Sequence, residues 1–138
     1  MKVILRADGN GKIGYGHVSR LNAFAEILEE KYEIVFLTKD ETDLTIIDES
    51  IKIELLPKGL DIDQEAQYMA DNYSYKTNII VADGYQFTSI YQASIKEKGF
   101  KLIYIDDMIN SHMYADCVIN HAIGVDSKQY FGENYVNY

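Results

Sequence analysis

Residues 2–30 read KVILRADGNGKIGYGHVSRLNAFAEILEE and contain the segments that decide the fold. Val3 to Leu5 form a short, continuous apolar run, which predicts a strand that is covered on both faces. Four glycines then lead over residues 9–16 to a stretch in which apolar side chains recur every three and four residues. This spacing is typical of one face of a helix and predicts a helix from about residue 17 to residue 30.

Further apolar runs rich in β-branched residues follow along the chain. They predict strands at residues 34–37, 51–56, 79–82, 102–105 and 117–119. Strands that alternate with helices form right-handed crossover units, so we expect an α/β, Rossmann-like fold in a single domain over residues 1–138. Its parallel sheet should have five or six strands and helices on both faces. Ligands of such sheets bind beyond the carboxyl ends of the strands.

Two more helices are expected between these strands. One covers residues 62–73, after an aspartate that can cap its start. The other covers residues 86–97, with Ile90 on its inner face and Gly99 as its end. The pattern of residues 40–50 is ambiguous.

The composition restricts the partners and the compartment. A net charge of −9 and an isoelectric point near 4.7 argue against nucleic acid or an anionic membrane surface as the main partner. The lone Cys117 cannot form an internal disulfide, and charged residues interrupt the N-terminal apolar run, so we expect a cytoplasmic protein. No apolar run approaches the roughly 18 residues that a membrane-spanning helix needs.

Polar side chains gather at the carboxyl ends of four predicted strands. They are Arg6 with Asp8, Asp83 with Tyr85, Asp106 with Asp107, and Asn120 with His121. Because these ends meet at one edge of a parallel sheet, we expect Asp8, Asp83 and Asn120 to share a cleft with the start of the first helix. Aspartate and asparagine also serve as turn and cap residues, so a purely structural role competes at each position.

The glycine-rich loop allows two interpretations. Glycines let the backbone turn tightly and approach a ligand, and a helix N-terminus offers N–H groups to a phosphate or a developing oxyanion. Gly9, Gly11 and Gly14 also satisfy the dinucleotide-binding spacing G-x-G-x-x-G, with Asp40 as a possible ribose ligand. Against that interpretation, the pair Ala7-Asp8 intervenes between the strand and Gly9, and His17 occupies the helix start, where the last glycine of the fingerprint should already lie inside the helix. The loop also lacks the lysine and hydroxyl residue of a Walker motif.

His17 is the strongest candidate for chemistry. The positive end of the helix dipole disfavours a second positive charge on its ring, so the neutral form that accepts a proton is favoured. Arg20 lies one turn further along and can hold the ring, a carboxylate or a phosphate. A helix-capping histidine is the structural alternative. His112, His121 and Cys117 lack zinc-like spacing, so no metal site is expected.

The segment RADGNGKIGYGHVSR, residues 6–20, resembles a family signature. The signature R-x-D-x-x-x-x-I-G-x-G-H-x-x-R opens the UDP-2,4-diacetamido-2,4,6-trideoxy-altropyranose hydrolases of pseudaminic acid biosynthesis and the related spore-coat polysaccharide proteins. Further matches are VADGYQF at 81–87, YIDDM at 104–108, ADCVIN at 115–120, Tyr130, Gly132 and Tyr135. The resemblance implies a GT-B-type architecture similar to that of the MurG-type glycosyltransferases.

The resemblance also implies an activity. Members of the family release UDP from a UDP-linked diacetamido-trideoxy sugar when water attacks the anomeric carbon, and His17 matches the histidine that activates the water. The implied substrate-binding residues are Asp8, Gly14, Gly16, Arg20, Asp83, Tyr85, Asp107 and Asn120. No metal or organic cofactor is implied.

Family members are longer and carry a C-terminal domain that binds UDP. By resemblance, residues 1–138 are therefore the N-terminal half of a two-domain enzyme and should be inactive in isolation. Two alternatives stay open: the acceptor-binding domain of a GT-B glycosyltransferase, and a non-catalytic domain that binds a nucleotide sugar.

Overall fold

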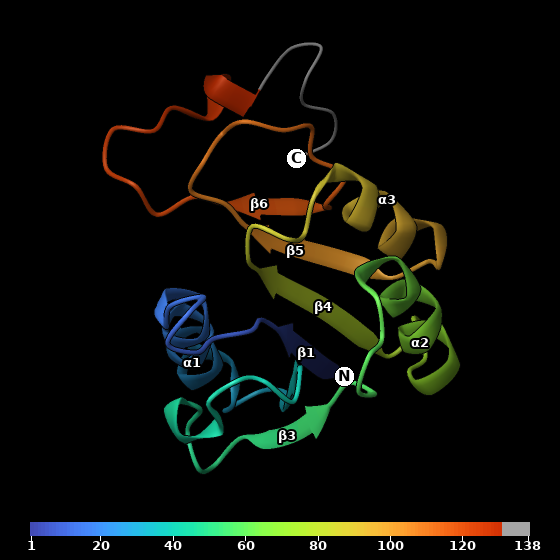
Figure 1. Ribbon diagram of the computed structural model, residues 1–138. Helices are drawn as coiled ribbons and strands as arrows, with labels where there is room; N and C mark the ends of the chain where they lie inside the picture. Colours follow the sequence, from blue (N-terminus) through green and yellow to red (C-terminus); the bar gives the residue numbers. More distant parts are fainter. Residues whose placement is uncertain (131–138) are drawn as a thin grey trace.

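The computed structural model describes residues 1–130, and its centre is a six-stranded sheet in the order β3-β2-β1-β4-β5-β6 (Figure 1). The strands are β1 (Lys2–Arg6), β2 (Glu33–Thr38), β3 (Lys52–Leu55), β4 (Asn78–Asp83), β5 (Lys101–Ile105) and β6 (Cys117–Ile119). Neighbouring strands pair in parallel throughout this sheet. The expected parallel α/β sheet is confirmed. Gly132 and Tyr135 lie outside the described residues.

Helices cover both faces of the sheet, as expected (Figure 1). They are α1 (Gly16–Leu28), α2 (Glu65–Asn72) and α3 (Ser89–Glu97), with the short 3-10 helices η1 (Leu44–Ile46), η2 (Ile62–Gln64) and η3 (Ser127–Tyr130). Successive strand residues point to opposite faces, so Leu5 packs in the cluster with Leu21 of α1. Ile4 packs in the other cluster, with Met69 of α2 and Ile95 of α3.

The strand order reverses between β1 and β4. The chain builds outward from β1 through β2 to β3 and then returns to place β4 on the other side of β1. Arg6 at the end of β1 lies opposite Ala82, one residue before the end of β4. The loops that leave β1 and β4 therefore diverge at one point of the carboxyl edge, which is where open α/β sheets bind their ligands.

The predicted inner face of the third helix is wrong at one position. Ile90 is 82% exposed, whereas Tyr91 and Ile95 are buried. The reason is that α3 begins only at Ser89, so its buried stripe follows Tyr91 and Ile95. At 100° per residue, Ile90 points well away from that stripe. The predicted end is confirmed: Gly99 has a φ of +88°, which favours glycine, and its N–H reaches the carbonyl of Lys96.

The segments before α1 and α2 differ in how they begin a helix. Asp61 and Gln64 form a reciprocal capping box at η2, which runs directly into α2, so the predicted start near residue 62 is confirmed. Tyr15, the N-cap of α1, makes no side-chain capping hydrogen bond. Among residues 1–130, no helix combines the length and the apolar character that crossing a membrane requires.

Candidate active site

Asp83 is the centre of a polar cluster at the reversal point of the sheet. It ends β4 and is fully buried. Its Oδ1 lies 2.7 Å from Nδ1 of His17, the second residue of α1. Arg20 donates from Nε to Oδ2 and from Nη2 to Oδ1, each at 2.7 Å. The fork of Arg20 therefore holds the carboxylate while the histidine binds it from one side.

These contacts fix the tautomer of His17. A carboxylate only accepts hydrogen bonds, so the proton of the short bond to Asp83 lies on Nδ1. Arg20 Nη2 is also 2.9 Å from Nδ1, but a protonated Nδ1 cannot accept, so this N–H is directed to the carboxylate. In the neutral imidazole the other ring nitrogen, Nε2, then carries the lone pair. His17 is thus oriented as a proton acceptor.

Tyr85 and Asp107 complete the cluster. The Tyr85 ring meets the His17 ring edge-on, with centroids 4.8 Å apart, and its hydroxyl donates to Asp107 at 3.2 Å. The charge of Asp107 raises the pKa of the Tyr85 phenol, which therefore stays a neutral donor. Arg20 also reaches Asp107, at 3.4 Å. Hydrogen bonding to Asp83 raises the pKa of the Arg20 guanidinium above its ordinary value, so it remains charged.

We call these five residues the His17 cluster: His17, Arg20, Asp83, Tyr85 and Asp107. All five were candidates from the sequence, and the fold brings them together from α1 and from the ends of β4 and β5.

The glycine-rich loop lies directly before this cluster. Asn10 Oδ1 accepts from the backbone N–H groups of Lys12 and Ile13, both at 2.9 Å, which closes the loop on itself. Gly14 has a φ of +91°, and a Cβ built on Gly14 or Gly16 would have no atom within 4 Å. The predicted site residues Gly14 and Gly16 thus border space that no neighbouring side chain fills.

Asp8 belongs to a different cluster. Its carboxylate accepts from Arg6 at 2.7 and 3.0 Å, from the Thr38 hydroxyl at 3.0 Å and from the Lys39 N–H at 2.9 Å. Burial opposes the ionisation of Asp8, but the attraction of Arg6 and these hydrogen bonds outweigh it and lower the pKa of Asp8. Gln86 donates to Asp8 at 3.1 Å and so connects it to the loop that carries Tyr85.

Glu65 is the other partner of Arg6 and was not singled out from the sequence. It is fully buried at the start of α2 and binds Arg6 at 2.8 and 3.0 Å. Tyr91 donates to it as well, at 3.0 Å. An acidic residue in the first turn of a helix is usually an exposed partner of the dipole, so the sequence gives no signal for this role.

Asn120 lies in a third group. It donates to the Tyr130 hydroxyl at 2.9 Å, and Tyr130 donates to Asp106 at 2.7 Å. We expected His17 to share a cleft with Asp8, Asp83 and Asn120. Of these three residues, only Asp83 forms a hydrogen bond with His17. β6 lies two strands away from β4, roughly 10 Å at about 4.8 Å per strand. Asp8, in turn, lies two residues beyond β1 and is held by Arg6, the last residue of that strand.

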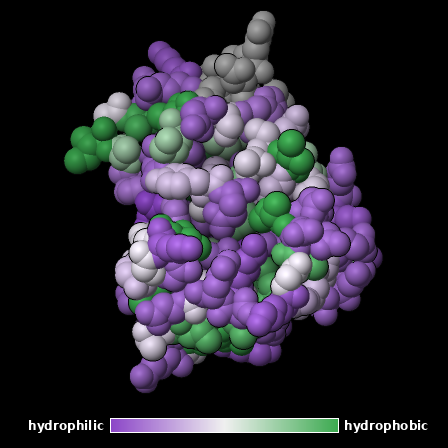
Figure 2. Space-filling model, in the orientation of Figure 1, coloured by the Kyte–Doolittle hydropathy of each residue, from purple (hydrophilic) through white to green (hydrophobic). Residues whose placement is uncertain are grey.

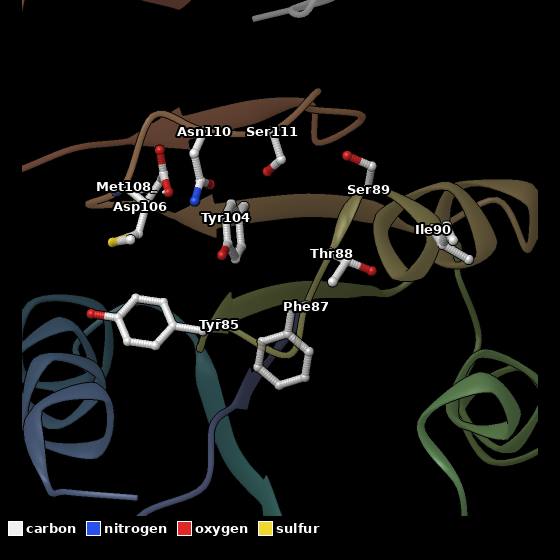
Figure 3. A pocket seen from close by; sticks show the side chains of 10 residues that line it. All are labelled: Tyr85, Phe87, Thr88, Ser89, Ile90, Tyr104, Asp106, Met108, Asn110 and Ser111. Atoms are coloured by element: carbon white, nitrogen blue, oxygen red, sulfur yellow. Dashed lines mark hydrogen bonds between the residues drawn. The ribbon is translucent and has the colours of Figure 1, made fainter.

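A pocket of about 430 Å³ opens beside the His17 cluster (Figure 3). Its lining residues are Tyr85, Phe87, Thr88, Ser89, Ile90, Tyr104, Asp106, Met108, Asn110 and Ser111. Tyr85 is shared by the pocket and the cluster, and Figure 3 shows its ring extending from the loop after β4 towards α1. Within residues 1–130, no group of three or more His, Cys, Asp or Glu side chains is placed to hold a metal ion.

The fold is a Rossmann-like α/β domain similar to a domain of the GT-B protein MurG. The crystal structure of Acinetobacter baumannii MurG matches with a TM-score of 0.55 at 12% sequence identity, over 99% of this chain and 45% of that chain. At this identity the match establishes the fold.

A curated relative was also found by sequence. It is an uncharacterized protein of Methanocaldococcus jannaschii, MJ1062, which is 29% identical over 140 residues, or 96% of this chain. The chain spans 28% of the length of that relative. No protein-family model matches the sequence.

Proposed function

We propose that this chain is the sugar-facing, N-terminal half of a nucleotide-sugar hydrolase in which His17 is the general base. The observation that carries the proposal is the hydrogen bond between His17 Nδ1 and the buried carboxylate of Asp83, at 2.7 Å. With Nδ1 engaged by Asp83, Nε2 is the ring nitrogen that can accept a proton in the neutral imidazole. A carboxylate-oriented imidazole is an efficient proton acceptor near neutral pH.

The proposed reaction needs only water and the UDP-sugar. The water oxygen bonds to the anomeric carbon while the bond from that carbon to the UDP oxygen breaks, and its electron pair leaves with UDP. One water proton moves to His17 Nε2. Asp83 then stabilises the imidazolium that forms, because its charge lies next to Nδ1–H. No cofactor takes part in these steps.

The other candidates take supporting roles in this proposal. Arg20 holds Asp83, and Tyr85 and Asp107 form the sugar-facing side of the His17 cluster. Gly14 and Gly16 keep the approach to the anomeric carbon open. We assign Asp8 and Asn120 to the walls of the site, because their side chains are engaged in clusters of their own.

The proposal includes a second, C-terminal domain that binds the uridine and the diphosphate. The substrate follows from the resemblance of residues 6–20 and is a UDP-linked diacetamido-trideoxy sugar of surface polysaccharide or pseudaminic-acid-type biosynthesis. A cytoplasmic location is part of the same proposal, since the single thiol, Cys117, is exposed and free.

The test is His17→Gln in the full-length protein that contains this chain. Turnover of the UDP-sugar should fall by about 100- to 10,000-fold, the usual contribution of positioned proton transfer, while substrate affinity changes little. His121→Gln removes an exposed histidine outside the His17 cluster and should leave turnover unchanged. If His17→Gln turns over as fast as wild type, His17 has only a structural role.

A GT-B acceptor-binding domain is the second candidate function, because its fold is that of MurG. In that case UDP release would depend on an added acceptor. Measuring UDP release with and without candidate acceptors separates the transferase from the hydrolase.

A further inference from the structure

Gln86 connects the His17 cluster with the buried charges around Arg6. It follows Tyr85 in the segment of residues 84–88, which joins β4 to α3 and which we call the Tyr85 loop. Its side-chain amide donates to Oδ2 of Asp8 at 3.1 Å, and a carboxylate only accepts, so the NH₂ group faces Asp8. A Cβ on Gly84 would overlap this amide, so a glycine is needed for the side chain to fold back over the loop.

Tyr85 does little to fix its own position. The side chain is 61% exposed, and its contacts are the edge-on meeting with the ring of His17 and one hydrogen bond to Asp107 at 3.2 Å. A single hydrogen bond at an exposed site contributes little to holding a ring in place. The direction of the Tyr85 ring therefore depends on the backbone of the Tyr85 loop.

The residues on both sides of Tyr85 are anchored to buried groups. The carbonyl of Gly84 accepts from the hydroxyl of the buried Tyr104 at 3.1 Å. Further along, the ring of Phe87 is 1% exposed and packs against the guanidinium of Arg6, whose Cζ lies 5.0 Å from the ring centroid. With the amide bond to Asp8, two of these three anchors lead to Arg6 or to its carboxylate partner.

Arg6, Asp8 and Glu65, which we call the Arg6 cluster, form a fixed base for these anchors. Hydrophilic residues surround small apolar patches on the face drawn in Figure 2, but Arg6 and Glu65 are fully buried. Burial opposes the charge of Arg6, yet its hydrogen bonds with Glu65 and Asp8 and their attraction raise the pKa of the guanidinium. Buried ion pairs often add no net stability over apolar packing of the same volume, whereas paired bonds to a planar guanidinium fix the direction of each partner.

We propose that Gln86 is a positioning residue: it transmits the fixed geometry of the Arg6 cluster to the Tyr85 loop and so keeps the Tyr85 ring against His17. Glu65 acts through the same connection, because it holds Arg6 from the side opposite to the sheet edge where the substrate would bind. The effect on turnover rests on the proposed function, in which Tyr85 forms the sugar-facing side of the His17 cluster. The position of the ring can be measured without any reaction.

The first test measures the contact between the rings of His17 and Tyr85 by NMR, in the ligand-free full-length protein with labelled histidine and tyrosine. The nuclear Overhauser effect between the two rings should be present in wild type and lost in Gln86→Ala. This variant should fold, because Asp8 keeps its bonds from Arg6, Thr38 and Lys39. An unchanged signal in folded Gln86→Ala would overturn the proposal.

Two variants separate the hydrogen bond from other effects of the substitution. Gln86→Glu keeps the shape of the side chain but brings a second carboxylate against Asp8, so at pH 8 it should also lose the signal. If Gln86→Glu keeps the signal, the bond to Asp8 does not position the loop. Gln67→Ala removes the exposed bond from Gln67 to Asp71 in α2 and should keep the signal. Its loss there would show that the signal does not report on Gln86.

Turnover supplies the second test. Gln86→Ala should lower kcat/KM for the UDP-sugar by about 10- to 100-fold, as expected for a misplaced contact residue. In a Tyr85→Ala background the same change should have no further effect, because Gln86 acts through Tyr85. Additive losses would overturn the proposal. If the NMR signal behaves as expected but wild type releases no UDP from any UDP-sugar, the hydrolase proposal fails and the positioning role of Gln86 stands.

Discussion

Replacing Asp83 by asparagine tests whether the buried carboxylate sets the protonation of His17. Asparagine keeps the shape of the side chain but removes the charge and adds two donors. With an amide N–H facing Nδ1, His17 must move its proton to Nε2, where it blocks the lone pair that the base needs. We therefore expect turnover of the UDP-sugar to fall by about 100- to 10,000-fold, as for the loss of the base itself.

The same substitution also has a measurable effect on stability. Asp83 is fully buried and accepts one hydrogen bond from His17 and two from Arg20. Weakening these charge-assisted bonds should cost about 1–3 kcal/mol of unfolding free energy, because Arg20 keeps the amide oxygen and Asp107 as partners. For a domain of this size, that corresponds to a fall in Tm of roughly 3–10 °C.

Asp107→Asn provides the control. It removes the other carboxylate that contacts Arg20 but does not touch His17. The Nδ1 proton stays in place, so turnover should fall by less than about tenfold. The assay is steady-state UDP release by both variants, with thermal unfolding to confirm folding. Comparable losses in Asp83→Asn and Asp107→Asn, or full activity of Asp83→Asn, would refute the tautomer argument.

Three further predictions follow from other parts of the structure. Gly14→Ala should destabilise the protein by about 1–2 kcal/mol and Gly16→Ala should not, since both sites are sterically open and only Gly14 has a positive φ; chemical unfolding of both variants checks this, and equal losses would contradict it. Because the pKa of Asp8 is lowered in the folded protein, its stabilisation is present above its unfolded pKa of about 3.9 and is lost as the pH falls through the folded value; unfolding free energies from pH 6 downwards should decline less steeply in Asp8→Asn than in wild type. Residues 1–138 expressed alone should fold, as judged by a cooperative unfolding transition, but release UDP negligibly compared with the full-length protein, because the uridine and diphosphate contacts that position the substrate are missing; equal rates would end the half-enzyme proposal.

The sequence predicted the sheet and the start of α1 because both depend on local pattern. Continuous β-branched runs give buried strands, and the stripe that follows His17 gives α1 its inner face. These local patterns therefore sufficed to place His17 and Asp83 at one edge of the sheet. Their mutual hydrogen bond follows from the reversal of strand order, which no local pattern encodes.

Asp8, Asn120 and Ile90 differ from their predicted surroundings because local sequence pattern does not contain the long-range contacts of a residue. Their positions after strand ends place Asp8 and Asn120 at the correct edge of the sheet. These positions do not determine where each side chain points or how far apart the strands lie. The residues that fix these side-chain directions are far away in the sequence. Glu65, for example, binds Arg6 and lies 59 residues further along the chain. The prediction for Ile90 was wrong for a smaller reason. Phe87 lies before α3, so the buried face of the helix is defined by Tyr91 and Ile95 and excludes Ile90.

The reversal of the sheet between β1 and β4 has a consequence for folding kinetics. His17 and Asp83 are 66 residues apart in the chain. They meet only after β4 has paired with β1, and β2 and β3 lie between these two strands in the sequence. Closing so long a loop is entropically expensive and slow compared with forming α1. The Nδ1 proton of His17, visible by NMR when held by a carboxylate, is therefore a reporter of central strand pairing during refolding. Its signal should appear with the global folding phase and after the helical signal of α1.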